Sequence, residues 1–128
     1  MDKTKQAEWT LWLNARAAKY WAEYRLVFSI LHAFECPKII LNNRLSSTAG
    51  RNHPEENKID LGTKFLAHSK EYATIIHTEI LPHEMAHQID YNLNGWPIGN
   101  RWHRDEWKVI MVKIGQKPER CHSMDLKK

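Results

Sequence analysis

The chain has 128 residues, of which 42% are hydrophobic and 27% are charged, proportions that are ordinary for a globular protein in water. This length suits one domain with a sizeable core, and no apolar run approaches the roughly 20 residues of a membrane-spanning helix. We therefore expect a single domain over residues 1–128 and no membrane contact, and the net charge of +4 excludes neither a protein nor a nucleic-acid partner.

The N-terminus and the two cysteines bear on the compartment. Met1–Gln6 leads into an amphipathic stretch and lacks a signal-peptide pattern, which predicts an intracellular protein, cytoplasmic or nuclear. Cys36 and Cys121 form no C-x-x-C pair, so these residues contain no zinc ribbon and no redox motif of that kind. In a reducing compartment we expect two free thiols.

The positive charge is concentrated in the last part of the chain. Residues 1–100 carry 11 Lys+Arg and 11 Asp+Glu, whereas residues 101–128 carry 8 Lys+Arg and 4 Asp+Glu. Such an excess is typical of a surface that contacts DNA, and equally of a solvated basic tail. Both interpretations stay open for residues 116–128, which show no periodicity.

Residues 3 to about 34 are predicted to form one long helix. The stretch contains no Gly or Pro, and its apolar residues recur at steps of three and four. This helical spacing favours core packing of the aromatic residues over a stacking platform for bases. The recurring positions are Trp9, Leu13, Ala17, Tyr20, Tyr24, Val27 and Leu31.

Three short strands are predicted next, over Lys38–Asn42, Ser46–Asn52 and Lys58–Leu61. Their short connections favour an antiparallel meander. Gly50 inside the second strand is typical of a bulge or of a close approach by another part of the chain. An edge strand beside a cleft could pair with an extended peptide.

The second half of the chain is predicted to be mainly helical. Lys64–His68 is expected to form a short helical turn, and Ser69 is expected to cap a helix over residues 70–92. Pro82 inside this segment predicts a kink or two abutting helices, because proline removes a hydrogen bond of the helix. A loop over residues 95–102 and a last helix over Asp105–Ile114, ended by Gly115, complete the prediction.

The sequence His83-Glu84-Met85-Ala86-His87 has the pattern H-E-x-x-H. On a helix, residues four apart lie on the same face, so both imidazoles can bind one metal ion. Glu84 can then act as general base on a water molecule that the metal activates, which is the arrangement of a zinc hydrolase. The alternative is a helix whose two histidines make ordinary hydrogen bonds.

A catalytic zinc usually has three protein ligands and one open position. The candidates for the third ligand are His103, Asp105 and Glu106. His103 is favoured because it stands at a loop-to-helix junction and because imidazole suits zinc. Glu106 would instead give a site of two His and one Glu.

Several further side chains are candidates for supporting roles. Tyr72, Tyr91, Arg104 and His122 are candidates for stabilising an oxyanion, and their spacing does not distinguish among them. Asp90 and Glu79 on the motif helix could orient a ligand His, although a surface salt bridge is favoured for both.

The chain resembles the SprT-like (Spartan-type) metalloprotease family over about residues 20–125. The segments that carry the resemblance are Leu41–Arg44, Thr48–Arg51, Lys58–Leu61, His83–His87, His103 with Trp107 four residues later, and Pro118–His122. In such proteins the residue after the third His is usually Gly, whereas here it is Arg104. Many members also continue into a zinc ribbon, which these 128 residues do not contain.

The resemblance implies a zinc site formed by His83, His87 and His103, with Glu84 as general base. It implies a zincin-like α+β domain: a long N-terminal helix, a small three-stranded antiparallel sheet, the motif helix and a C-terminal helix. It also implies proteolysis linked to DNA, such as removal of proteins crosslinked to it.

These patterns together predict a zinc-dependent endopeptidase that acts on protein or peptide substrates, including DNA-associated proteins. Two alternatives stay open. One is a nucleic-acid-associated module that keeps the metal site but has little activity. The other is a helical interaction protein in which the histidines are incidental.

Overall fold

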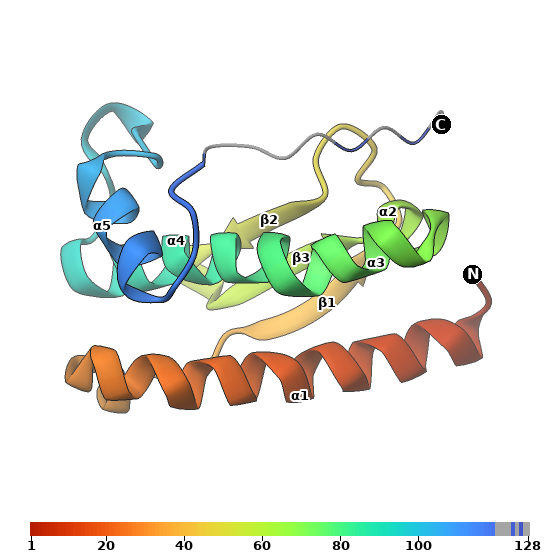
Figure 1. Cartoon of the computed structure of the whole chain (residues 1–128), viewed down its shortest axis with the longest axis horizontal. Coiled ribbons are helices and arrows are strands. Elements are labelled where there is room, and N and C mark those ends of the chain that lie inside the picture. Colours follow the sequence, from red (N-terminus) through yellow and green to blue (C-terminus); the bar gives the residue numbers. More distant parts are fainter. Residues whose placement is uncertain (120–123, 125, 127–128) are drawn as a thin grey trace.

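A three-stranded sheet lies between helices in the computed structural model, which describes residues 1–119, 124 and 126 (Figure 1). The predicted α+β class is confirmed. In chain order the elements are α1 (Lys3–Val27), η1 (Ser29–Ala33), β1 (Lys38–Asn42), β2 (Gly50–His53), η2 (Pro54–Glu56), β3 (Lys58–Gly62), α2 (Thr63–His68), α3 (Lys70–Ile75), η3 (Ile76–Ile80), α4 (Leu81–Asn94), η4 (Ile98–Asn100) and α5 (Asp105–Lys113). No helix of the described residues is long and apolar enough to cross a membrane.

The predicted first helix is shorter than expected. It begins after Asp2, whose carboxylate accepts a hydrogen bond from the Lys5 amide at 2.7 Å, and it ends at Val27. Phe28 is extended, and a 3-10 turn then carries Leu31 into the core. Arg25 holds this reversal by donating hydrogen bonds to the carbonyl oxygens of Leu31 and Phe34. These tertiary bonds break the helix where the sequence has no Gly or Pro.

The sheet is mixed, so the predicted antiparallel meander is wrong. The strand order is β1-β3-β2: β1 pairs with β3 in parallel, and β2 pairs with β3 antiparallel. The short turn through η2 does make β2 and β3 a hairpin. The connection from β1 to β2, residues 43–49, is long enough to skip one place in the sheet, and β3 later fills that place.

Asn14 of α1 closes one edge of this sheet. Its side-chain amide donates to the Ile39 carbonyl oxygen at 2.8 Å and accepts from the Ile39 amide at 2.9 Å. The two bonds occupy both main-chain groups of Ile39 as an added strand would, which blunts the β1 edge. The other edge strand, β2, lies beside α4.

The motif helix continues a line of helices that runs over the sheet (Figure 1). Ser69 caps α3 by accepting a hydrogen bond from the Tyr72 amide, as predicted. Pro82 lies in the first turn of α4, which is one of the two predicted outcomes. The turn before it, η3, is a wider π turn that was not predicted.

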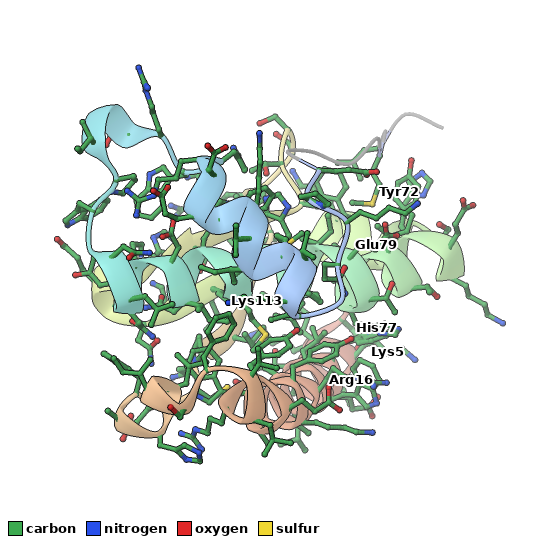
Figure 2. The ribbon with its side chains drawn as sticks, turned by 60° about the vertical axis from the view of Figure 1, so that its left-hand side comes forward. Lys5, Arg16, Tyr72, His77, Glu79 and Lys113 are labelled. Carbon is green, nitrogen blue, oxygen red and sulfur yellow. The ribbon has the colours of Figure 1, made fainter. Side chains whose placement is uncertain are left out.

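α1 also supports this line of helices at the π turn. The Tyr20 hydroxyl donates to the His77 carbonyl oxygen at 2.9 Å, and the Trp12 ring meets the His77 ring edge-on at 4.9 Å. Figure 2 shows His77 facing α1, with Arg16 of that helix close by. The long helix therefore contacts both β1 and the element that leads into the motif.

The last helix closes the fold over α4. Trp107, Ile110 and Met111 are buried, as predicted. After Lys113 the chain reverses: the Gly115 amide donates to Val112 and the Gln116 amide to Met111. This pair of bonds is a Schellman motif, and Gly115 supplies the positive φ of +83° that it requires.

Candidate metal centre

α4 presents His83 and His87 on the same face of one helical turn. Both side chains are buried, and their Nε2 atoms lie 3.3 Å apart. The helix begins at Leu81, so the preceding proline does not disturb the turn that carries the two rings. The i, i+4 spacing thus produces the convergence that the sequence indicated.

His103 reaches the same point from the loop before α5. Its Nε2 lies 3.3 Å from Nε2 of His83, and the ligand atoms of the three histidines all lie within 4.8 Å of one another. Two nitrogens bound to one tetrahedral zinc at about 2.0–2.1 Å would be separated by about 3.3 Å. The three imidazoles are therefore placed to bind one metal ion. Within the described residues, no other group of His, Cys, Asp or Glu side chains is arranged in this way.

The buried Trp107 ring of α5 packs against all three histidines. Ring centroids lie 4.8 Å from His83, 5.1 Å from His87 and 4.8 Å from His103, and the His87 ring is stacked on the indole. Trp107 thus restricts how each imidazole can rotate. It is fully buried, so it also removes water from one side of the cluster.

Burial keeps the His87 imidazole neutral. The pKa of His87 is lowered to about 2, mainly because the ring is removed from water and in part because His83 and His103 lie beside it, against an opposing main-chain interaction with Trp102. A neutral imidazole offers a free electron pair on nitrogen. His87 therefore has a nitrogen available to bind a cation across the neutral pH range.

Glu84 lies beside the histidines without joining their cluster. One carboxylate oxygen is 3.8 Å from His83 Nε2, and the other accepts a hydrogen bond from the Asn52 amide of β2 at 3.0 Å. Burial raises the pKa of Glu84 to about 7, against the opposing effects of that hydrogen bond and of Arg51. A carboxyl group with this pKa can both accept and release a proton near neutrality.

The cluster opens into a cleft of about 500 Å³ between α4, β2 and the α4–α5 loop. Its lining combines the three histidines and Glu84 with hydroxyl, amide and cationic side chains. The lining consists of Ser47, Thr48, Gly50, Arg51, Asn52, Pro54, His83, Glu84, His87, Trp102 and His103. Among the described residues that line the cleft, Glu84 is the only acidic one, and Arg51 lies at an exposed position.

Other candidates from the sequence lie elsewhere. Asp105 and Glu106 are exposed in the first turn of α5 and are not part of the metal-binding group. Tyr72 stacks on His68, and Tyr91 packs against Trp96. Neither tyrosine lines the cleft.

The other residues for which the sequence suggested a supporting role are placed as follows in the structure. Arg104 binds Asp90 and is not in the cleft lining, so its suggested role at an oxyanion receives no support. Asp90 is fully buried, which makes the expected surface salt bridge wrong, whereas Glu79 lies exposed on η3. His122 lies outside the described residues.

Two features of the site were not predicted. The Asn52 amide holds Glu84, but a main-chain donor leaves no trace in a side-chain pattern. Trp107 was expected only in the core, although its place one turn into the helix that follows His103 could have indicated contact with the ligands.

The comparisons with known proteins agree with this geometry. The model of the SprT-like family matches residues 7–126. The chain belongs to the SprT-like family. Two proteins named "Protein SprT" are similar to it: one from Vibrio atlanticus (strain LGP32) is 34% identical over 94 residues, and one from Pseudomonas savastanoi pv. phaseolicola (strain 1448A / Race 6) is 29% identical over 117 residues.

These alignments cover 73% and 91% of this SprT-like chain but 52% and 66% of the two relatives. The chain thus spans about half to two thirds of the length of the curated relatives. No solved structure matches it. The family resemblance inferred from the motifs is confirmed.

Proposed function

We propose that this SprT-like chain is a zinc-dependent endopeptidase. The observation that carries the proposal is the meeting of three imidazoles, two of them buried and that of His103 partly buried, whose Nε2 atoms lie 3.3 Å apart in the His83–His87 and His83–His103 pairs, with a glutamate of raised pKa next to them in an open cleft. Three neutral nitrogen ligands with an open fourth position are typical of catalytic zinc. His83, His87 and His103 would hold the ion.

A zinc ion held by these ligands would supply Lewis-acid activation of a water molecule and of a peptide carbonyl. Glu84 takes the proton of the attacking water and delivers it to the leaving nitrogen, for which its pKa near 7 is suited. The Asn52 amide fixes the Glu84 carboxylate through one oxygen and leaves the other facing His83. Trp107 excludes water from behind the imidazoles.

The position of β2 supports a peptide as substrate. β2 is an edge strand, and Gly50, Arg51 and Asn52 from it line the cleft. The opposite edge of the sheet is closed by Asn14. An extended peptide could run along β2 past Glu84, held mainly by its main chain.

The test combines metal content with proteolysis. Wild-type protein, Glu84→Gln and His103→Ala would be analysed for zinc and assayed for cleavage of casein and histone, each with and without single-stranded DNA. We expect one zinc per chain in the wild type, near-complete loss of cleavage in Glu84→Gln with zinc retained, and weaker zinc binding in His103→Ala. Glu71→Gln, an exposed change on α3, is the matched control and should behave as wild type.

Each result decides between the candidate functions. Zinc without cleavage under any condition would reject the peptidase in favour of a metal-binding module. Cleavage that persists in Glu84→Gln would reject the assigned general base. A requirement for DNA would support a DNA-linked substrate and direct attention to the basic residues 101–128.

A further inference from the structure

We infer that the buried ion pair between Arg104 and Asp90 is a clamp that positions His103 for metal binding. The inference rests on the proposed metal centre and concerns two residues that are not part of the cleft lining. The clamp joins the residue directly after the third histidine to the helix that carries the other two.

Arg104 and Asp90 form a bidentate ion pair. Arg104 Nη2 donates to Asp90 Oδ1 at 2.9 Å, and Arg104 Nε donates to Oδ2 of the same carboxylate at 3.2 Å. The Asp90 side chain is fully buried, and that of Arg104 is only 18% exposed. Such a fork fixes the orientation of both groups, which a single bond to a lysine would not do.

Asp90 stands on the ligand face of α4, three residues after His87. It also accepts a hydrogen bond from the Asn94 side chain at 2.8 Å, which ties it to the end of the helix. A carboxylate buried this fully is unfavourable without a charged partner. Conformations in which Arg104 swings away from α4 are therefore disfavoured.

The α4–α5 loop needs such a constraint. It contains two glycines, and Gly95, Gly99 and Asn100 all have positive φ, so its backbone has many conformations available in the absence of fixed contacts. An exposed hydrogen bond from the Trp96 indole to Glu55 holds the start of the loop. The clamp fixes its end, where His103 must reach within 3.3 Å of His83.

Arg104 is also well placed to transmit this constraint. It is the N-cap residue of α5, and its carbonyl oxygen accepts from the Lys108 amide at 3.1 Å. Holding Arg104 thus sets both the start of α5, which carries Trp107, and the direction in which His103 leaves the backbone. Arg104 and Asp90 are positioning residues, and we assign them no step in catalysis.

The test measures zinc affinity, by competition with a chromogenic chelator, in Arg104→Gln, Asp90→Asn and the double variant. We expect each single change to weaken zinc binding by about 10- to 100-fold, the range found when partners of metal ligands are removed. The cobalt-substituted variants should show the altered absorption bands of His103→Ala. Glu106→Gln is the matched control, because it removes only the exposed second partner of Arg104, 3.4 Å away, and it should bind zinc as wild type does.

The double variant separates positioning from simple stability. With no charge left buried alone, its thermal stability should recover toward wild type, whereas its zinc affinity should stay low because the fork is still absent. Zinc affinity that recovers together with stability, or that is unchanged in a folded Arg104→Gln, would overturn the clamp.

Two safeguards keep the experiment decisive. If Arg104→Gln does not fold, Arg104→Lys keeps the charge but loses the fork, and it should still weaken zinc binding; wild-type affinity there would count against the clamp. If the wild type binds no zinc, the metal centre and the proposed function fail together. If the wild type binds zinc and lacks peptidase activity, only the proposed function fails.

Discussion

Gly50 is a residue of the sheet at which side chains of η3 and α4 approach closely. A Cβ atom at this position would lie 2.7 Å from Cγ2 of Ile80 and 3.2 Å from Cγ of Glu84. The prediction of a close approach at this glycine is therefore confirmed, and the neighbour is the general base proposed above. The missing side chain lets Glu84 reach the Asn52 amide.

Gly50→Ala should destabilise the protein by about 1–3 kcal/mol, because the new methyl group overlaps Ile80 and displaces Glu84. Urea denaturation measures the loss, and proteolysis should fall as well. Ser47→Ala, an exposed change in the same cleft, should alter stability by less than about 0.5 kcal/mol. An unchanged unfolding free energy in Gly50→Ala would show that the two elements can separate freely.

Cys36 shows how burial affects the chemistry of a single group. Burial raises the pKa of its thiol to about 11, and Arg25 opposes the shift only partly. The folded protein therefore keeps the protonated thiol until the pH approaches 11. At pH 8 only about one thiol in a thousand would be the reactive thiolate.

We expect iodoacetamide to modify Cys36 at pH 8 at least about tenfold more slowly in the folded protein than in urea, measured in a Cys121→Ser background. The folded-state rate should rise about tenfold per pH unit between pH 8 and 10. Equal rates with and without urea at pH 8 would mean that the thiol is not protected by the fold.

At the scale of elements, the two edge strands of the sheet differ in what lies beside them. The amide of Asn14 occupies the edge of β1, and β2 borders the cleft. A bare strand edge is a template for pairing with other chains. With the Ile39 groups of β1 occupied, β2 is the edge strand that borders the cleft and the one that would pair with the peptide substrate proposed above.

Asn14→Ala should cost about 2–3 kcal/mol, because two buried main-chain groups of Ile39 lose their partners. It should also increase association at high concentration, which light scattering would detect. Asn14→Asp keeps the acceptor for the Ile39 amide and should lie between alanine and wild type. Equal losses for aspartate and alanine would contradict this account of the edge.

At the scale of the whole molecule, the candidate centre joins parts of the chain that are distant in sequence. α4 supplies two histidines, the α4–α5 loop supplies the third, α5 supplies Trp107 and β2 supplies the amide that holds Glu84. A metal ion that binds the three histidines, which these elements bring together only in the fold, favours the folded state over the unfolded chain.

Zinc at about a thousand times its dissociation constant should add about 4 kcal/mol of stability and raise the melting temperature by on the order of 10 °C. A chelator should reverse the effect, and His103→Ala should abolish most of it. His32→Ala, an exposed histidine on η1, serves as the control. A zinc effect that survives in His103→Ala would place the ion elsewhere.

Local patterns predicted much of this structure. The strand Lys38–Asn42, the Ser69 cap and the shared face of His83 and His87 follow from spacing and residue type within a few positions. The order of the strands in the sheet was not predictable from these patterns, because it depends on the path that residues 43–49 take between β1 and β2. The burial of Asp90 did not follow either, because its partner Arg104 is 14 residues away and both look like surface charges in the sequence.

The π turn η3, residues Ile76–Ile80, has a consequence for how this helix can change through evolution. A π turn contains one residue more than the α-helical turn it replaces, so it is equivalent to a single-residue insertion. Deleting one codon there would restore a regular helix and rotate everything before it by about 100° relative to His83. His77 would then turn away from α1, so the part of the helix that carries His83 and His87 would lose the contacts with Tyr20 and Trp12 that support it.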